Sequence, residues 1–67
     1  MKELVSKLLS EQDELIAKME KLKAFIGADV YEKTLSGKHK MLLRKQLEVM
    51  LAYRDVLDER IEDLEGL

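Results

Sequence analysis

The chain has no cysteine and no proline, and among its 67 residues there are only three glycines, three aromatic residues and one histidine. The absence of cysteine excludes disulfides and thiolate metal sites. With one histidine, a zinc site would need Asp or Glu for its other ligands, so we expect neither a metal nor a cofactor. The small core of so short a chain seldom keeps a protein folded without disulfides, a bound metal or self-association. Self-association is the remaining means of stabilisation.

Long hydrophobic runs are also missing from the sequence. No stretch reaches the roughly 18–20 apolar residues of a membrane span, and charged residues follow Met1 too closely for a signal peptide. We therefore expect a soluble intracellular protein with no membrane partner. The pI near 5.4 and the shortage of aromatic rings argue against duplex or single-stranded nucleic acid as a partner.

The apolar residues that are present recur at the spacing of an α-helix. Residues 1–26 carry one apolar seam and residues 42–64 carry another. Between Gly27 and Gly37 the helical pattern breaks down. The order of seam, break and seam predicts two helices that fold back on each other.

We accordingly predict an all-α fold, a single antiparallel helical hairpin over residues 1–67. Its first helix should span about residues 2–26 and its second about 37–64, with Ser36 as the N-cap of the second. The connector, residues 27–36, is expected to form a short lid against the arms.

The second helix carries more apolar residues than one neighbouring helix can cover. Besides its seam it has a strip formed by Leu42, Val49, Tyr53 and Val56 on an adjoining face. Apolar surface of this kind marks an interface. We expect these four residues to lie between chains in a homo-oligomeric helical bundle.

Two polar residues interrupt the seams. In the predicted hairpin, positions that sum to roughly 66 face each other, which places Gln12 opposite Arg54, and such a polar pair can fix register and oligomeric state. The alternative is that Arg54 reaches a surface carboxylate such as Glu11.

The charges are strongly separated along the chain. Residues 18–45 carry eight Lys and Arg against three Asp and Glu, a net of +5, and the rest carries four against eleven, a net of −7. Lys38, His39 and Lys40 crowd the start of the second helix, where the helix dipole is already positive, so an anion is the natural complement. Either a phosphate-bearing ligand or the acidic C-terminal segment of a neighbouring chain could supply it.

Within this basic end we select the residues with suitable chemistry for a nucleotide. Lys38, Lys40 and Arg44 are predicted to contact phosphates, and Tyr31 is predicted to stack on a base. Catalytic motifs are missing: there is no phosphate-cradling glycine loop and no nucleophile paired with a base. We expect a protein that is not an enzyme.

The chain resembles a group of short phage and prophage proteins related to a small protein of crAss-like phages. The resemblance lies in KLKAFIG (residues 21–27), in TLS (residues 34–36) and in the second helix. The matching residues of that helix are Leu42, Leu43, Gln46, Leu47, Met50, Tyr53, Leu57, Arg60 and Ile61. These proteins resemble the hairpin domain of phage anti-CBASS and anti-Thoeris sponges, which bind cyclic nucleotide immune signals.

The resemblance implies a homo-oligomer, hexameric in the anti-CBASS sponges, that works in the cytoplasm of an infected bacterium. It implies a cyclic dinucleotide or a cyclic ADP-ribose isomer as ligand, held without cleavage by an aromatic ring and by Lys, Arg or Thr groups. Thr34 joins the predicted site on this ground. The chain departs from these relatives at Leu4, where many have tyrosine, so either the stacking ring is lost or Tyr31 serves a different ligand.

Two hypotheses therefore stand. In the first, the protein is a non-catalytic sponge for a cyclic nucleotide. In the second, it is a helical-hairpin module that only assembles with itself or another protein and has no small ligand. The lysines at the start of the second helix favour the first, and the predominance of packing residues favours the second.

Overall fold

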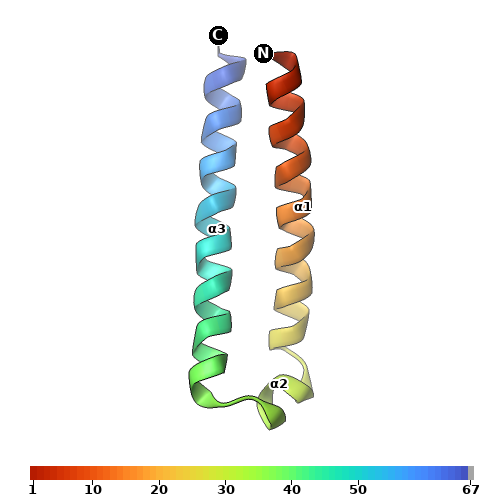
Figure 1. The fold of residues 1–67 in the computed structure, drawn as a ribbon, viewed down its shortest axis with the longest axis vertical. Coiled ribbons are helices and arrows are strands. Elements are labelled where there is room, and N and C mark those ends of the chain that lie inside the picture. Colours follow the sequence, from red (N-terminus) through yellow and green to blue (C-terminus); the bar gives the residue numbers. More distant parts are fainter. Residues whose placement is uncertain (67) are drawn as a thin grey trace.

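The chain forms two long helices that pack side by side in opposite directions (Figure 1). The computed structural model describes residues 1–66, without the side chain of Val30. Helix α1 spans Lys2–Ile26, the short α2 spans Asp29–Thr34, and α3 spans Gly37–Glu65. The hairpin is about 50 Å long and 16 by 12 Å across. Both chain ends lie at one end of it and α2 lies at the other. The predicted antiparallel hairpin with a short segment between its arms is confirmed.

Local sequence explains where the helices stop and start. After Ile26, the N–H of Gly27 still bonds the carbonyl of Lys23 at 3.1 Å, and the next residue is extended, which ends α1. Ser36 is also extended, and its hydroxyl accepts a hydrogen bond from the N–H of His39 at 3.1 Å. The predicted N-cap of the second helix is therefore confirmed.

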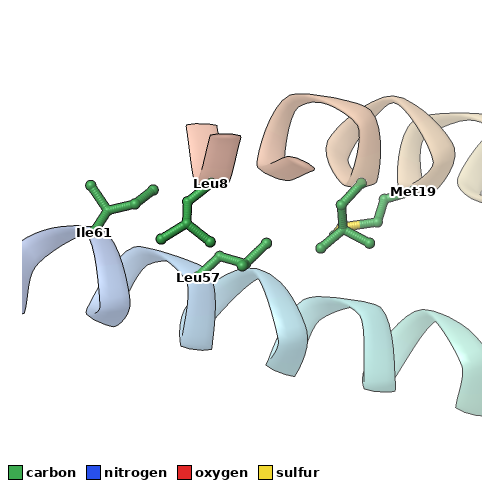
Figure 2. Packing of buried hydrophobic residues seen from close by; sticks show 5 residues of the cluster. Leu8, Met19, Leu57 and Ile61 are labelled. Atoms are coloured by element: carbon green, nitrogen blue, oxygen red, sulfur yellow. The ribbon is translucent and has the colours of Figure 1, made fainter. Parts of the chain in front are cut away.

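The core is a single row of side chains between α1 and α3. Leu8 of α1 points between Leu57 and Ile61 of α3, and Met19 extends the row toward the turn (Figure 2). Leu57 and Met19 are almost completely buried. Around this row lie the partly buried residues Val5, Leu47, Met50, Leu51 and Leu64.

The polar pair that was predicted between the two helices is not formed. The amide of Gln12 donates a hydrogen bond to the carboxylate of Asp58, one helical turn beyond Arg54. The guanidinium of Arg54 lies 3.5 Å from the carboxylate of its neighbour Asp55. The predicted pairing of Gln12 with Arg54 is wrong, because each of the two side chains has a different polar partner on α3. The alternative, an Arg54 that reaches a surface carboxylate, is nearer the finding, with Asp55 in place of Glu11.

The strip of Leu42, Val49, Tyr53 and Val56 lies outside the hairpin's core. All four side chains are exposed in the single chain, Val49 most of all at 63%. Helix α1 contacts the other side of α3 and cannot cover them. Their burial between chains stays a prediction.

None of the helices in the described part of the chain is both long enough and apolar enough to cross a membrane.

Replacing Ser36 with alanine should lower the free energy of unfolding by about 1 kcal/mol, because the N–H of His39 loses its acceptor at the start of α3. Urea unfolding at a fixed protein concentration measures the change. The matched control is Ser10→Ala, on the exposed face of α1, where alanine should be neutral or slightly stabilising. Equal stabilities for the two variants would show that the cap contributes nothing.

Candidate functional site at the turn

Helix α2 packs its tyrosine into the turn end of the hairpin. The Tyr31 side chain is completely buried, and its ring meets that of Phe25 edge-on at 6.2 Å between centroids. Its hydroxyl donates to the carbonyl oxygen of Lys40 at 3.1 Å and accepts from Nε of Arg44 at 3.2 Å. One side chain thus connects α1 and α2 to the first two turns of α3.

Lys40 is held beside this tyrosine. Its ammonium donates to the backbone carbonyl of Glu32 at 2.8 Å and lies 3.4 Å from the Glu32 carboxylate. The same ammonium lies 5.7 Å from the centre of the Tyr31 ring, within the range of a cation–π contact. The Lys40 side chain is therefore fixed in place, although a quarter of its surface remains accessible.

Arg44 is the more accessible of the two cations. The hydrogen bond to the Tyr31 hydroxyl is the main cause that raises the pKa of Arg44 above its ordinary value, and the Coulombic interaction with Tyr31 acts in the same direction. The guanidinium therefore remains positive at any physiological pH. Within the described part of the chain, no carboxylate lies at ion-pair distance from Arg44.

These residues surround an open hollow of about 340 Å³. Its lining consists of Tyr31, Glu32, Gly37, Lys40, Met41 and Arg44. Two cations face one carboxylate there, and Gly37 begins α3, so the positive end of the helix dipole adds to the field. The hollow can accept an anionic group.

A slightly larger hollow of about 360 Å³ lies at the opposite end of the hairpin. Its lining is mostly apolar, with Lys2 and Glu65 as its charged side chains. These two side chains carry opposite charges, whereas two cationic side chains face one carboxylate in the hollow at the turn. The hollow at the turn is the better candidate despite its smaller volume.

Three of the five predicted site residues meet at this hollow and two do not. Tyr31, Lys40 and Arg44 line it, whereas Lys38 and Thr34 are exposed outside its lining. Lys38 precedes Lys40 by two residues, which turns it to the other side of α3. The buried ring of Tyr31 offers no face to a base in this conformation, so its observed role is to hold Arg44.

Sequence reasoning missed the other members of the hollow. Glu32 reaches Lys40 through both its backbone carbonyl and its carboxylate, a contact made across the turn between α2 and α3. Helical periodicity predicts contacts within one helix and does not predict this contact between two helices. Gly37 and Met41 were likewise unidentified.

The fold and the hollow together define a small all-helical hairpin protein with an anion-accepting end. In the described part of the chain, no group of three or more His, Cys, Asp or Glu side chains is placed to hold a metal ion. The chain belongs to the Sequestin family, which matches it over residues 2–63. Membership of this family suggests a sequestering protein. No curated protein and no solved structure gives a significant match.

Replacing Tyr31 with phenylalanine should lower the free energy of unfolding by about 1 kcal/mol, because the carbonyl of Lys40 and Nε of Arg44 lose their hydroxyl partner while the ring packing is kept. Thermal and urea unfolding measure the loss. Tyr53→Phe is the matched control, since the Tyr53 side chain is exposed. A Tyr31→Phe chain as stable as the unchanged one would contradict this account of the turn.

Proposed function

We propose that this protein sequesters a cyclic nucleotide signal at the turn-end hollow and releases it chemically unchanged. The observation that carries the proposal is the pair of fixed cations, Lys40 and Arg44, on one hollow of a chain from a sequestering family. Family membership supports the sequestering activity. The nature of the ligand rests on the chemistry of the hollow and on the resemblance to phage sponges.

Arg44 supplies the main phosphate contact in this proposal. Its Nε–H bonds the Tyr31 hydroxyl, which fixes the plane of the guanidinium and leaves the two Nη groups for a ligand. Two parallel N–H donors match the spacing of two phosphate oxygens. Because the side chain is already oriented, little rotational freedom is lost on binding.

Lys40 acts as a second and exchangeable contact. Its ammonium is shared between the backbone carbonyl and the carboxylate of Glu32. A phosphate in the hollow would compete with that carboxylate for the ammonium, while the backbone contact keeps Lys40 in position. Glu32 therefore weakens anion binding.

The size of the hollow limits what it can enclose. Its volume of about 340 Å³ is at the lower end of the roughly 300–1,000 Å³ of small-molecule sites. The hollow therefore receives the phosphate-bearing part of a nucleotide, and the bases lie beyond it. Phe25, exposed to 38% and in contact with the Tyr31 ring, is the aromatic side chain available for a base at this end.

The ligand class is a cyclic dinucleotide or a cyclic ADP-ribose isomer. Each of these ligands carries two phosphate groups and no free terminal phosphate. Two cations can neutralise these two phosphates, and no larger basic surface is needed. On the resemblance to phage anti-CBASS and anti-Thoeris sponges, we propose that the protein works in the cytoplasm of an infected bacterium. We also propose that it acts as a homo-oligomer through Leu42, Val49, Tyr53 and Val56.

A second candidate function is assembly alone, without a small ligand. The exposed strip on α3 favours it, because four apolar side chains on one helix face fit a protein interface. In that case the cations at the turn would serve assembly or solubility. Ligand binding decides between the two candidates.

Calorimetry against a panel of cyclic dinucleotides and cyclic ADP-ribose isomers should identify a ligand, and Arg44→Gln should weaken its binding about ten- to a hundredfold, because a charged hydrogen-bonded contact is lost. Lys33→Gln is the matched control: it removes one positive charge at the same end of the hairpin, on α2 and outside the hollow. An equal loss of affinity in both variants would mean that the overall positive charge of this end, and no specific contact of Arg44, binds the ligand. No binding by the unchanged chain would leave assembly as the function.

Glu32→Gln should strengthen binding of the same nucleotide several-fold, since the phosphate no longer competes with a carboxylate for Lys40. The gain should shrink as salt concentration rises, because the competition is electrostatic. Calorimetric titrations at low and high salt measure both effects. Weaker binding by the Glu32→Gln variant would place the ligand away from Lys40.

The sequestering mode itself can be tested directly. A complex incubated for hours and then heated should release the nucleotide unchanged, as shown by chromatography and mass spectrometry. Linear or hydrolysed product would contradict a non-catalytic function.

Sedimentation should find the folded chain as an oligomer at micromolar concentration, and Val49→Asp should dissociate it, because an unpaired carboxylate in an apolar interface costs several kcal/mol. Ala17→Asp adds the same group to the exposed side of α1, away from the strip, and should leave the assembly intact. A stable folded monomer of 7.8 kDa would refute self-association.

A further inference from the structure

We propose that α3 pairs with α3 of a second copy in antiparallel orientation, with a two-fold axis beside Val49 and the basic start of each helix against the acidic end of the other. The inference rests on the self-association included in the proposed function and specifies its geometry. It follows from the shape of the exposed strip and from the distribution of charge along α3.

The strip is symmetric about its middle. Leu42, Val49 and Val56 follow one another at seven-residue intervals, so they lie on nearly the same line along α3. In an antiparallel pair centred on Val49, that residue meets its own copy, and Leu42 of each chain meets Val56 of the other. Tyr53 lies beside this line and widens the contact. Leu42, Val49 and Val56 then face apolar residues, and Tyr53 of each chain lies at the level of Lys45 of the other.

The charge along α3 selects this orientation over the parallel one. Residues 37–45 carry four Lys and Arg and no Asp or Glu, a net of +4. Residues 55–65 carry six Asp and Glu with Arg60 as their one cation, a net of −5. Packed helices lie about 8–10 Å apart, within roughly one Debye length at physiological salt. Parallel packing would bring like segments together, whereas antiparallel packing joins opposite ones.

The strip face itself carries Lys38 near the start of α3 and both Arg60 and Asp63 near its end. At about 100° per residue, Lys38 and Asp63 both point within about 40° of Val49. Antiparallel pairing about Val49 brings Lys38 of one copy to within about one helical turn of Asp63 of the other. The two-fold symmetry repeats this contact at both ends of the pair. Arg60 of the other copy lies at the level of Lys38 in the same register, so Lys38 has one like and one opposite charge nearby, and the orientation rests on the net charges of the two segments.

The pairing leaves the proposed nucleotide site open. Arg44 and Lys40 point about 140° or more away from Val49 around α3, and they line the hollow beside α2. A second α3 on the strip therefore covers neither cation. Nucleotide binding and pairing can be tested separately.

Cysteine cross-linking tests the orientation, and the chain has no cysteine of its own to interfere. With the short linker bismaleimidoethane, Val49→Cys should form a covalent dimer. Leu42→Cys alone should not, because its two copies would lie about 21 Å apart. Val56→Cys alone should fail for the same reason. A mixture of Leu42→Cys with a tagged Val56→Cys chain should give the mixed dimer, identified by its mass.

The reverse pattern would overturn the proposal. Self-linked Leu42→Cys and Val56→Cys dimers, with no preference for the mixed product, would indicate parallel packing. No product at Val49 would show that the strip is not an interface. The Val49→Cys chain with Arg44→Gln should cross-link normally. A failed nucleotide site would therefore leave the cross-links unchanged, and a failed pairing would leave nucleotide binding unchanged.

Charge reversal provides an independent measurement. Asp63→Lys should weaken dimerisation several-fold, because it places a further cation beside Lys38 and Arg60 at two symmetric contacts. The matched control is Glu62→Lys, which makes the same change of charge on the opposite side of α3 and should weaken dimerisation less. Equal losses in the two variants would mean that Asp63 does not lie at the interface.

Discussion

The packing of one face of α1 on one face of α3 is the constraint on which the rest of the structure depends. A core only one row of side chains deep, centred on Met19 and Leu57, buries a small part of each helix. Most of the circumference of α1 and α3 therefore faces outward. Any apolar residue away from the seam is exposed, whatever its neighbours in sequence. The exposed strip and the need for further burial both follow from a two-helix architecture in a chain of this length.

Tyr31 connects this fold to the candidate site. Burial of its ring fixes α2 against the end of the hairpin, and its hydroxyl joins the carbonyl of Lys40 and Nε of Arg44. The interaction that closes the turn is thus the same one that orients the guanidinium. A flexible loop of equal length could bring the same cations to the same end, but it would leave them free to rotate. The helical turn supplies preorganisation, which lowers the entropic cost of binding.

The sequence predicted the features that depend on periodicity and local capping. The seams, the antiparallel arms and the Ser36 cap follow from spacing and side-chain chemistry within one helix. The partner of Gln12 was misassigned, because helical spacing brings both Arg54 and Asp58, one turn apart, near Gln12 and does not decide which side chain it bonds. Side-chain placement also explains why only some of the residues of the candidate site were predicted correctly. Charge counting located the basic end, whereas the separation of Lys38 from Lys40 and the contact of Glu32 with Lys40 depend on three-dimensional placement.

Helix α3 has three faces that do not overlap. One face, with Leu57 and Ile61, holds the hairpin together. A second face carries the strip around Val49. The side that carries Lys40 and Arg44 opens on the hollow. Because a sequestering protein only has to hold its ligand, it needs no moving lid and no reactive group, and three stable surfaces on one helix can suffice. Distribution of these surfaces around a single helix explains how so short a chain can combine a core with a proposed interface and a proposed binding site.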